Sequence, residues 1–259
     1  MSGFILELDA QMTSSSKIVF GSMRMHPERQ GIKDWANLLL HASSLGVLRI
    51  HCSDEYETFP FLLNVLEEVR RSSPKLEFRF IVKLAEPHFD ENVFDAKKLL
   101  TRIDVYREAL QTDQLDCIQW MWRGNLEDKT GRIRGFSESA NNILEVVDQA
   151  KYLGKIKSFH CFPYTFEFAQ HALEAPFVDG LTIYRNPLEI EYDPLLARAQ
   201  AIGKRVLVIR PFKTGEALAD IRVANLIKFS ANSSTVDGIV VSCSSIKHLE
   251  ECVQAAALC

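Results

Sequence analysis

The chain has 259 residues, of which 47% are hydrophobic and 25% charged, and its formal net charge is −4. This composition is typical of a globular protein and lacks the basic excess of a nucleic-acid-binding surface, so no nucleic-acid partner is expected. The apolar runs fall short of the roughly 18 residues of a membrane span. The first residues lack the basic flank of a signal peptide, which predicts a cytoplasmic protein with no membrane partner.

The six cysteines form no CxxC pair and match no zinc-site spacing. Several fall on or beside predicted strands, where a free thiol behaves as a small apolar side chain. The sequence therefore predicts neither disulfides nor a metal site.

Short apolar runs typical of buried strands alternate with amphipathic segments typical of helices. The predicted strands are residues 17–22, the apolar part of 47–57, 78–83, 116–122, 155–162, 180–184, 205–209 and 238–241. The predicted helices are residues 32–45, 59–71, about 92–111, 141–153, 166–173, 194–202, 216–230 and 245–258. A short extra strand is predicted at 4–8 and a polar loop at 123–137.

Eight strand–helix units without a linker predict an α/β fold of one domain, residues 1–259, in which a parallel sheet closes into a (β/α)8 TIM barrel. Active sites of such barrels lie at the C-terminal ends of the strands. That rule selects Arg24, His51, Tyr56, Lys83, Met121, Trp122, His160, Arg185, Arg210 and residues 242–245.

The order and spacing of several short motifs resemble the aldo-keto reductase family over nearly the whole chain. The motifs lie at residues 20–24, 50–56, 82–83, 154–157, 186–188, 244–245 and 248–251. The resemblance implies a barrel with NADPH across its mouth and a catalytic Asp, Tyr, Lys and His. Tyr56 and Lys83 match two of these four positions, whereas His51 stands at the Asp position and Met121 at the His position.

The cofactor positions that the resemblance implies are also altered. Phe162 and Pro163 replace a Ser-Asn pair that holds the nicotinamide amide, and neither side chain can make that hydrogen bond. Arg185 and Arg210 replace uncharged residues of the cofactor site. We therefore expect a degenerate active site with no cofactor. NADPH is the alternative, with Ser244, Ser245 and Glu251 as its contacts.

Individual site residues allow two interpretations. His51 is either a neutral core histidine or an acid/base group, and His160 is equally ambiguous. Trp122 either packs in the core or forms a substrate surface, and both Trp122 and His160 are predicted to bind the substrate. Arg185 and Arg210, with Arg24 nearby, are expected to bind an anion beside Lys83. If Asp54 or Glu55 turned inward, it would neutralise that lysine instead.

These residues suggest a non-redox enzyme of carbohydrate metabolism, an isomerase, epimerase or lyase, acting on a small anionic sugar-like or carbonyl metabolite. His51, Tyr56 and Lys83 would move protons, and the arginines would hold the anion. One alternative is a divergent NADPH-dependent carbonyl reductase, an oxidoreductase with Tyr56 as proton donor. Another is a non-catalytic binding or partner subunit. A homo-oligomer is possible in each case.

Overall fold

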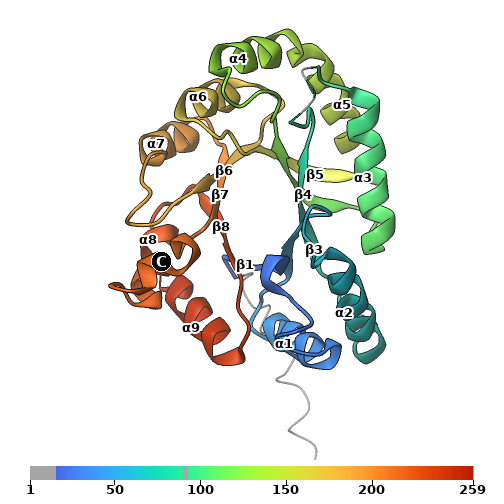
Figure 1. Cartoon of the computed structure of the whole chain (residues 1–259), viewed down its shortest axis with the longest axis vertical. Helices are drawn as coiled ribbons and strands as arrows, with labels where there is room; N and C mark the ends of the chain where they lie inside the picture. The colour runs from blue at the N-terminus through green and yellow to red at the C-terminus, as the bar shows by residue number, and fades with distance from the viewer. Residues whose placement is uncertain (1–15, 90, 92, 259) are drawn as a thin grey trace, which may run out of the picture.

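The computed structural model describes residues 16–89, 91 and 93–258, in which eight parallel strands close into a barrel surrounded by helices (Figure 1). The strands are β1 (Ile18–Gly21), β2 (Arg49–Cys52), β3 (Arg79–Ala85), β4 (Leu115–Met121), β5 (Ile156–Cys161), β6 (Gly180–Tyr184), β7 (Arg205–Ile209) and β8 (Val236–Val241). Each strand pairs with the next in the chain, and β8 pairs with β1. This closed sheet confirms the predicted (β/α)8 barrel.

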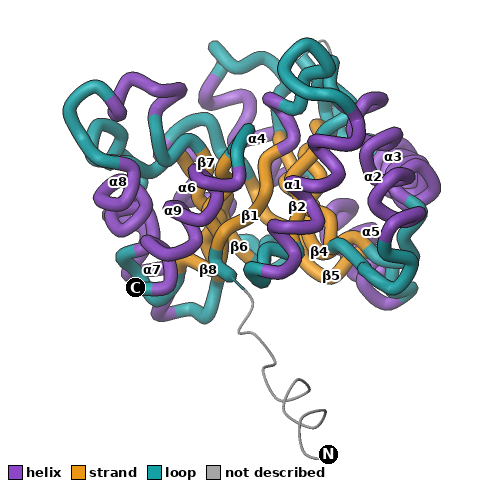
Figure 2. Tube along the Cα trace, turned by 90° about the horizontal axis from the view of Figure 1, so that it is seen from below, coloured by secondary structure: helices purple, strands orange, loops and turns teal. Residues whose placement is uncertain are grey.

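Helices enclose the strands when the barrel is seen from the side (Figure 2). The α-helices are α1 (Ile32–Ser44), α2 (Phe59–Ser72), α3 (Ala96–Leu110), α4 (Lys129–Glu138), α5 (Ala140–Tyr152), α6 (Phe166–Glu174), α7 (Asp193–Ala201), α8 (Val223–Ala231) and α9 (Ile246–Ala257). Two 3-10 helices, η1 (Ser22–Arg24) and η2 (Lys213–Leu218), follow β1 and β7. Both 3-10 segments therefore lie at the end of the barrel where the strands finish.

The barrel interior changes from apolar to polar along the strands. Side chains of a barrel strand alternate between the interior and the helices outside. A buried apolar cluster inside the barrel contains Val19, Ile81, Cys117 and Leu207. Two residues further along their strands, Lys83 and Gln119 put polar groups inside the barrel where branched apolar residues usually dominate. This change marks the end of the packed core.

Two helical predictions differ from the structure. The predicted loop at 123–137 contains α4, whose N-terminus is capped by the Asp128 carboxylate accepting from the Gly131 N–H at 2.8 Å. The two glycines of α4 lower its helix propensity, but the buried Phe136 holds it against the barrel. The predicted helix at 216–230 is broken between η2 and α8. The predicted strand at 4–8 lies outside the described residues.

The absence of disulfides is confirmed for Cys52, Cys117, Cys161, Cys243 and Cys252, which are buried free thiols. In the same described part of the chain, no three His, Cys, Asp or Glu side chains are arranged to hold a metal ion. No helix within residues 16–258, leaving aside 90 and 92, is long and apolar enough to cross a membrane.

Candidate active site

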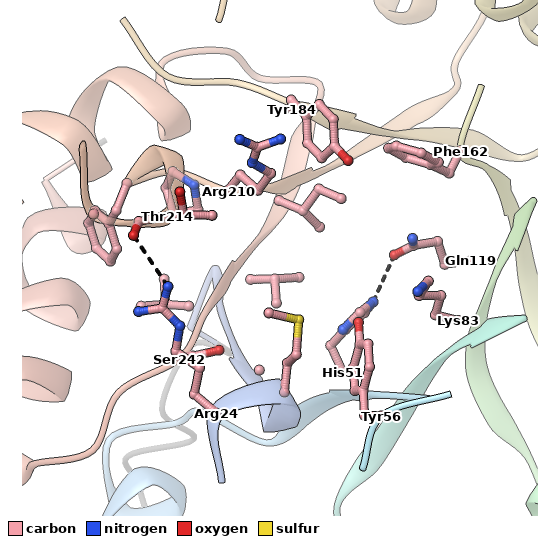
Figure 3. Close-up of a pocket in the computed structure, with 18 of the residues that line it drawn as sticks. Arg24, His51, Tyr56, Lys83, Gln119, Phe162, Tyr184, Arg210, Thr214 and Ser242 are labelled. Carbon is pink, nitrogen blue, oxygen red and sulfur yellow. Dashed lines mark hydrogen bonds between the residues drawn. The ribbon is translucent and has the colours of Figure 1, made fainter. Parts of the chain in front are cut away.

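A cavity of about 460 Å³ opens at the C-terminal ends of the barrel strands (Figure 3). This size suits a small-molecule ligand. Of the residues predicted for the site, the cavity lining includes Arg24, His51, Tyr56, Lys83, Met121 and Arg210. The barrel thus brings together residues spread over most of the chain.

Tyr56 and Lys83 lie close together in the lining of this cavity. Lys83 lies on β3, and Tyr56 lies in the loop after β2, so neighbouring strands carry both. The Lys83 Nζ atom is 5.1 Å from the centre of the Tyr56 ring. Burial raises the pKa of Tyr56 well above its usual range, so the hydroxyl keeps its proton at neutral pH.

Lys83 has a counter-ion in Glu55, the residue immediately before Tyr56. The Glu55 Oε2 atom lies 3.0 Å from Lys83 Nζ, and the two side chains are 23% and 20% exposed. The expectation that Arg185, Arg210 and Lys83 form a group of cations without a carboxylate is therefore wrong. An acidic neighbour has turned inward, the alternative that the sequence left open.

Arg123 holds the Glu55 carboxylate from its other side. Its Nη1 and Nη2 atoms each lie 2.7 Å from a different Glu55 oxygen, a bidentate geometry that fixes the carboxylate. Burial opposes ionisation of Glu55, but hydrogen bonds from Arg123 and Lys83 outweigh it and keep the pKa of Glu55 below its usual range. Arg123 also lies 2.8 Å from His88 Nε2. No spacing in the sequence indicated the contact between Glu55 and Arg123, because these two residues are 68 positions apart.

His51 is buried and pairs with an amide rather than with a charge (Figure 3). Its Nε2 atom lies 2.7 Å from Gln119 Oε1, which accepts the imidazole hydrogen. Burial, reinforced by the charge of Lys83, lowers the pKa of His51 to about 4. His51 is therefore neutral at neutral pH and cannot replace the carboxylate that the resemblance implies at its position.

Met121, at the position where the resemblance implies a His, belongs to an apolar wall with Ala85 and Phe162. The hydroxyl of Tyr164 lies against this wall and donates to Met121 Sδ at 3.4 Å. The same hydroxyl accepts a hydrogen bond from Arg123 Nε at 2.9 Å. Tyr164 lines the cavity but was not among the predicted site residues. The sequence signal that could have identified Tyr164 is its position just after β5, since active sites of such barrels lie at the C-terminal ends of the strands.

Arg210 and Arg24 lie on the opposite side of the cavity (Figure 3). The Arg210 guanidinium is 4.5 Å from the Tyr184 ring centre, and its Nη2 is 3.4 Å from Glu189 Oε1. Arg24 donates to the Thr214 carbonyl oxygen at 3.4 Å. No carboxylate in the described part of the chain pairs with Arg24. This side therefore carries positive charge that is incompletely paired.

Arg185 does not take part in this cavity, so the prediction that it converges with Arg210 over Lys83 is wrong. It is 4% exposed and forms a bidentate ion pair with Asp193, at 2.8 and 3.2 Å. It also donates to the carbonyl oxygens of Phe229 and Ser230. Because Tyr184 points into the barrel, the next residue along the chain points outward, toward α8.

Two further predicted substrate residues lie away from the cavity. Trp122 is 2% exposed and stacks on Phe94 with ring centres 6.4 Å apart, which favours the packing interpretation. His160 is 4% exposed and lies deeper in the barrel, and burial lowers its pKa. Its Nδ1 atom has no hydrogen-bond partner among the described residues.

The predicted cofactor contacts Ser244, Ser245 and Glu251 are not among the residues that line the cavity. Ser245 caps α9, its hydroxyl accepting from the His248 N–H at 3.3 Å, and the Ser244 carbonyl accepts from the Gln30 amide. Glu251 lies on α9. Ser242 lines the cavity instead. Contacts of Ser244, Ser245 and Glu251 with a cofactor stay predictions.

No protein-family model matches the chain, and no curated protein matches it. Solved structures do match. A putative aldo-keto reductase from Pseudomonas aeruginosa aligns with a TM-score of 0.71 and 20% identity over 94% of this chain and 91% of that chain. An aldo-keto reductase from Bacillus halodurans, in its holo form, aligns with a TM-score of 0.70 and 15% identity over 93% and 86%.

An aldo-keto reductase from Klebsiella pneumoniae, in complex with NADP and acetate, aligns with a TM-score of 0.65 and 18% identity over 93% of this chain and 85% of that chain. At these identities the likeness establishes the fold, which is that of the aldo-keto reductases. The resemblance seen in the sequence is confirmed at that level. The expectation that no cofactor binds gains no support from these neighbours.

Proposed function

We propose that the protein is an oxidoreductase that reduces a carbonyl group, with Tyr56 as the proton donor and NADPH as the source of hydride. One observation carries this proposal: a lysine and a tyrosine lie side by side in the lining of one cavity, and a carboxylate pairs with that lysine. Glu55 lies 3.0 Å from Lys83 Nζ, and that atom lies 5.1 Å from the Tyr56 ring centre. The resemblance implies the same three groups, with the carboxylate at position 51.

The environment of Tyr56 suits proton donation. Its hydroxyl is protonated at neutral pH because burial disfavours the phenolate. When the proton moves to a substrate oxygen, the Lys83 ammonium next to the ring stabilises the phenolate that forms. Glu55 and Arg123 keep that ammonium in place. Buried apolar neighbours such as Met121 exclude water, which strengthens these electrostatic interactions.

The donor set of the cavity fits a phosphorylated cofactor such as NADPH. Arg24, Arg210 and Ser242 line one side, and guanidinium and hydroxyl groups are common partners of phosphate oxygens. Arg210 Nε is buried without a hydrogen-bond partner among the described residues. Tyr184 offers a ring surface, while Phe162 offers no hydrogen bond to an amide. NADPH supplies the hydride when bound, and these residues would hold it.

Two observations weigh against the non-redox hypothesis from the sequence. Its anion site required Arg185, which is buried in an ion pair with Asp193. Its acid/base group was His51, whose pKa is lowered to about 4, so the imidazole is neutral at neutral pH. The one hydrogen of the neutral ring is donated to Gln119. The reductase was the alternative, and it needs neither residue.

The test combines cofactor binding with turnover. We expect calorimetric titration to give a dissociation constant for NADPH in the low micromolar range, about −8 kcal/mol. We also expect NADPH-dependent reduction of 4-nitrobenzaldehyde, followed by the loss of NADPH absorbance. Tyr56→Phe should keep NADPH binding and lower kcat by about 10²- to 10⁴-fold, because it removes the proton donor.

Tyr152→Phe is the matched control, since Tyr152 is 91% exposed and outside the cavity. Its turnover should equal that of the wild type. The proposal fails if NADPH does not bind at millimolar concentration. It also fails if Tyr56→Phe reduces the aldehyde as fast as the wild type.

A further inference from the structure

A second tyrosine hydroxyl lies in the same cavity as that of Tyr56. Tyr164 follows β5 and lines the cavity, and its hydroxyl contacts Arg123 and Met121. The hydroxyl oxygen accepts from Arg123 Nε at 2.9 Å, and the hydroxyl hydrogen points to Met121 Sδ at 3.4 Å. Its lone pair is thus held by a cation, while its hydrogen is directed at a thioether.

This arrangement makes the Tyr164 hydroxyl a ready hydrogen-bond donor. A thioether sulfur is a weak acceptor, so little is lost when the hydrogen turns to another atom. A carbonyl oxygen entering the cavity is a better acceptor. The bond from the Arg123 guanidinium also polarises the hydroxyl and strengthens the hydrogen bond that it donates.

The same guanidinium connects Tyr164 to the centre of the site. Arg123 binds the Glu55 carboxylate at 2.7 Å through two nitrogens, and Glu55 binds Lys83 beside Tyr56. A continuous series of charged contacts therefore joins the two tyrosines. The Tyr164 hydroxyl and the Tyr56 ring are thus both held by this one series of contacts, which suits two groups that act on one substrate oxygen.

The backbone of Tyr164 is held in an unusual conformation. Its φ of 65° lies in the left-handed region, which bulky residues rarely adopt. The ring is fixed by Phe162, whose ring centre is 4.7 Å away, and by the Arg132 guanidinium at 5.6 Å. Residues held in such conformations cluster at functional sites. The position of Tyr164 is therefore imposed by the fold around it.

We infer that Tyr164 is a second catalytic residue, whose hydroxyl donates a hydrogen bond to the carbonyl oxygen of the substrate. Met121 cannot donate one from the position where the resemblance implies a His. Tyr56 gives up its proton to the oxygen, and Tyr164 keeps its own while stabilising the negative charge that develops there. The inference rests on the proposed reductase function.

The experiment compares three variants with the wild type in NADPH-dependent reduction of 4-nitrobenzaldehyde. Tyr164→Phe should lower kcat by about 10²-fold, the usual effect of removing one donor to a developing oxyanion. Its NADPH dissociation constant should stay unchanged. Tyr192→Phe also removes a tyrosine hydroxyl near the barrel end, but Tyr192 does not line the cavity, so turnover should equal the wild-type value.

The double variant Tyr164→Phe with Met121→His tests the role directly. It places an imidazole donor beside the position of the lost hydroxyl. We expect its kcat to be at least tenfold higher than that of Tyr164→Phe, which corresponds to about 1.4 kcal/mol. A residue that only supports the fold would not be replaced in this way.

Three results would contradict the inference. Wild-type turnover in Tyr164→Phe would overturn it and leave the proposed function standing. A loss of turnover matched by a loss of melting temperature, with no recovery in the double variant, would assign Tyr164 a structural role. Absence of any aldehyde reduction by the wild type would overturn the proposed function and this inference with it.

Discussion

The two sides of the cavity differ in how completely their charges are paired. On the paired side, Tyr56 and Lys83 line the cavity, while Glu55 and Arg123 lie outside the lining. The ion pairs of Lys83 and Arg123 with Glu55 measure 3.0 and 2.7 Å. The open side consists of Arg24, Arg210 and Ser242. Its shortest charged contact, between Arg210 and Glu189, measures 3.4 Å. Under the proposed function, the paired side is pre-organised for proton donation, whereas the open side keeps positive charge for the phosphate groups of NADPH.

The different origins of the two sides explain this contrast. The paired side comes from the ends of β2, β3 and β4, which are hydrogen-bonded neighbours in the barrel. The open side comes mainly from the segments after β1 and β7, where Arg210 and Thr214 have positive φ. Strand ends hold side chains rigidly, while such connecting segments are held by fewer contacts.

The largest expected effect is a loss of stability at acidic pH, caused by protonation of His51, which is hydrogen-bonded to Gln119 beneath the paired side. His51 has a pKa near 4 when folded and about 6.5 when unfolded, so between these values the unfolded chain binds more protons. Stability therefore falls as the pH is lowered from 6.5 to 4, by on the order of 3 kcal/mol from this group. We expect urea denaturation to show this loss in the wild type.

The control is His51→Gln, which keeps a polar side chain beside Gln119 but does not titrate. Its free energy of unfolding should fall less than that of the wild type over the same pH range. Equal slopes for the two proteins would show that His51 titrates normally in the fold.

The next largest effect is expected when the Glu55 carboxylate, which links Lys83 to Arg123, is removed. Glu55→Gln leaves Lys83 and Arg123 facing each other without a counter-ion. We expect a loss of about 2 kcal/mol in the free energy of unfolding, because charged hydrogen bonds are lost. Because the folded pKa of Glu55 is depressed, this difference is complete above its ordinary value of 4.5 and shrinks as the pH falls through the depressed value.

Chemical denaturation at neutral and acidic pH measures this difference. Glu67→Gln is a suitable control, since Glu67 forms an exposed i,i+4 pair with Arg71 on α2. Such pairs contribute little. If Glu55→Gln were as stable as this control, the paired side would not be a rigid unit.

The smallest effect concerns the open side. Arg24→Ala should weaken NADPH binding by about tenfold, or 1.4 kcal/mol, because it removes a cation without disturbing an ion pair within the described residues. Its melting temperature without ligand should equal that of the wild type. Arg205→Ala removes an exposed arginine at the opposite end of β7 and should leave NADPH affinity unchanged. An equal loss in both variants would indicate general attraction of an anion rather than a site.

The sequence predicted the scaffold well because strand and helix periodicity recur eight times in a fixed order. Tyr56 and Lys83 were found because a barrel places chemistry at strand ends, a rule that depends on local order alone. Arg185 also lies at the end of a strand, but the prediction that it enters the cavity was wrong. Consecutive residues of a strand point alternately into the barrel and toward the helices, and the sequence alone did not show that Tyr184 points inward and Arg185 outward.

The remaining site residues depend on contacts that no local pattern encodes. Glu55 and Asp54 are adjacent acidic residues, and only the fold turns Glu55 to Lys83 while Asp54 contacts Arg102. Arg123 lies in a segment predicted as a polar loop, and its role follows from a partner 68 positions away. Tyr164 depends on a backbone conformation that tyrosine rarely takes. The sequence therefore left Glu55 as one of two alternatives and did not select Arg123 or Tyr164, whose contacts depend on the fold.

The inward turn of Glu55 has a consequence for how such a site is recognised from a sequence. A counter-ion supplied four positions further along the chain keeps the charge of the lysine balanced while changing the motif at which a sequence search looks. Lys83 is mostly buried, and Glu55 is the carboxylate that pairs with its ammonium in the described part of the chain. The same charge balance can therefore be built from an acid at either position, and only the fold reveals which one supplies it.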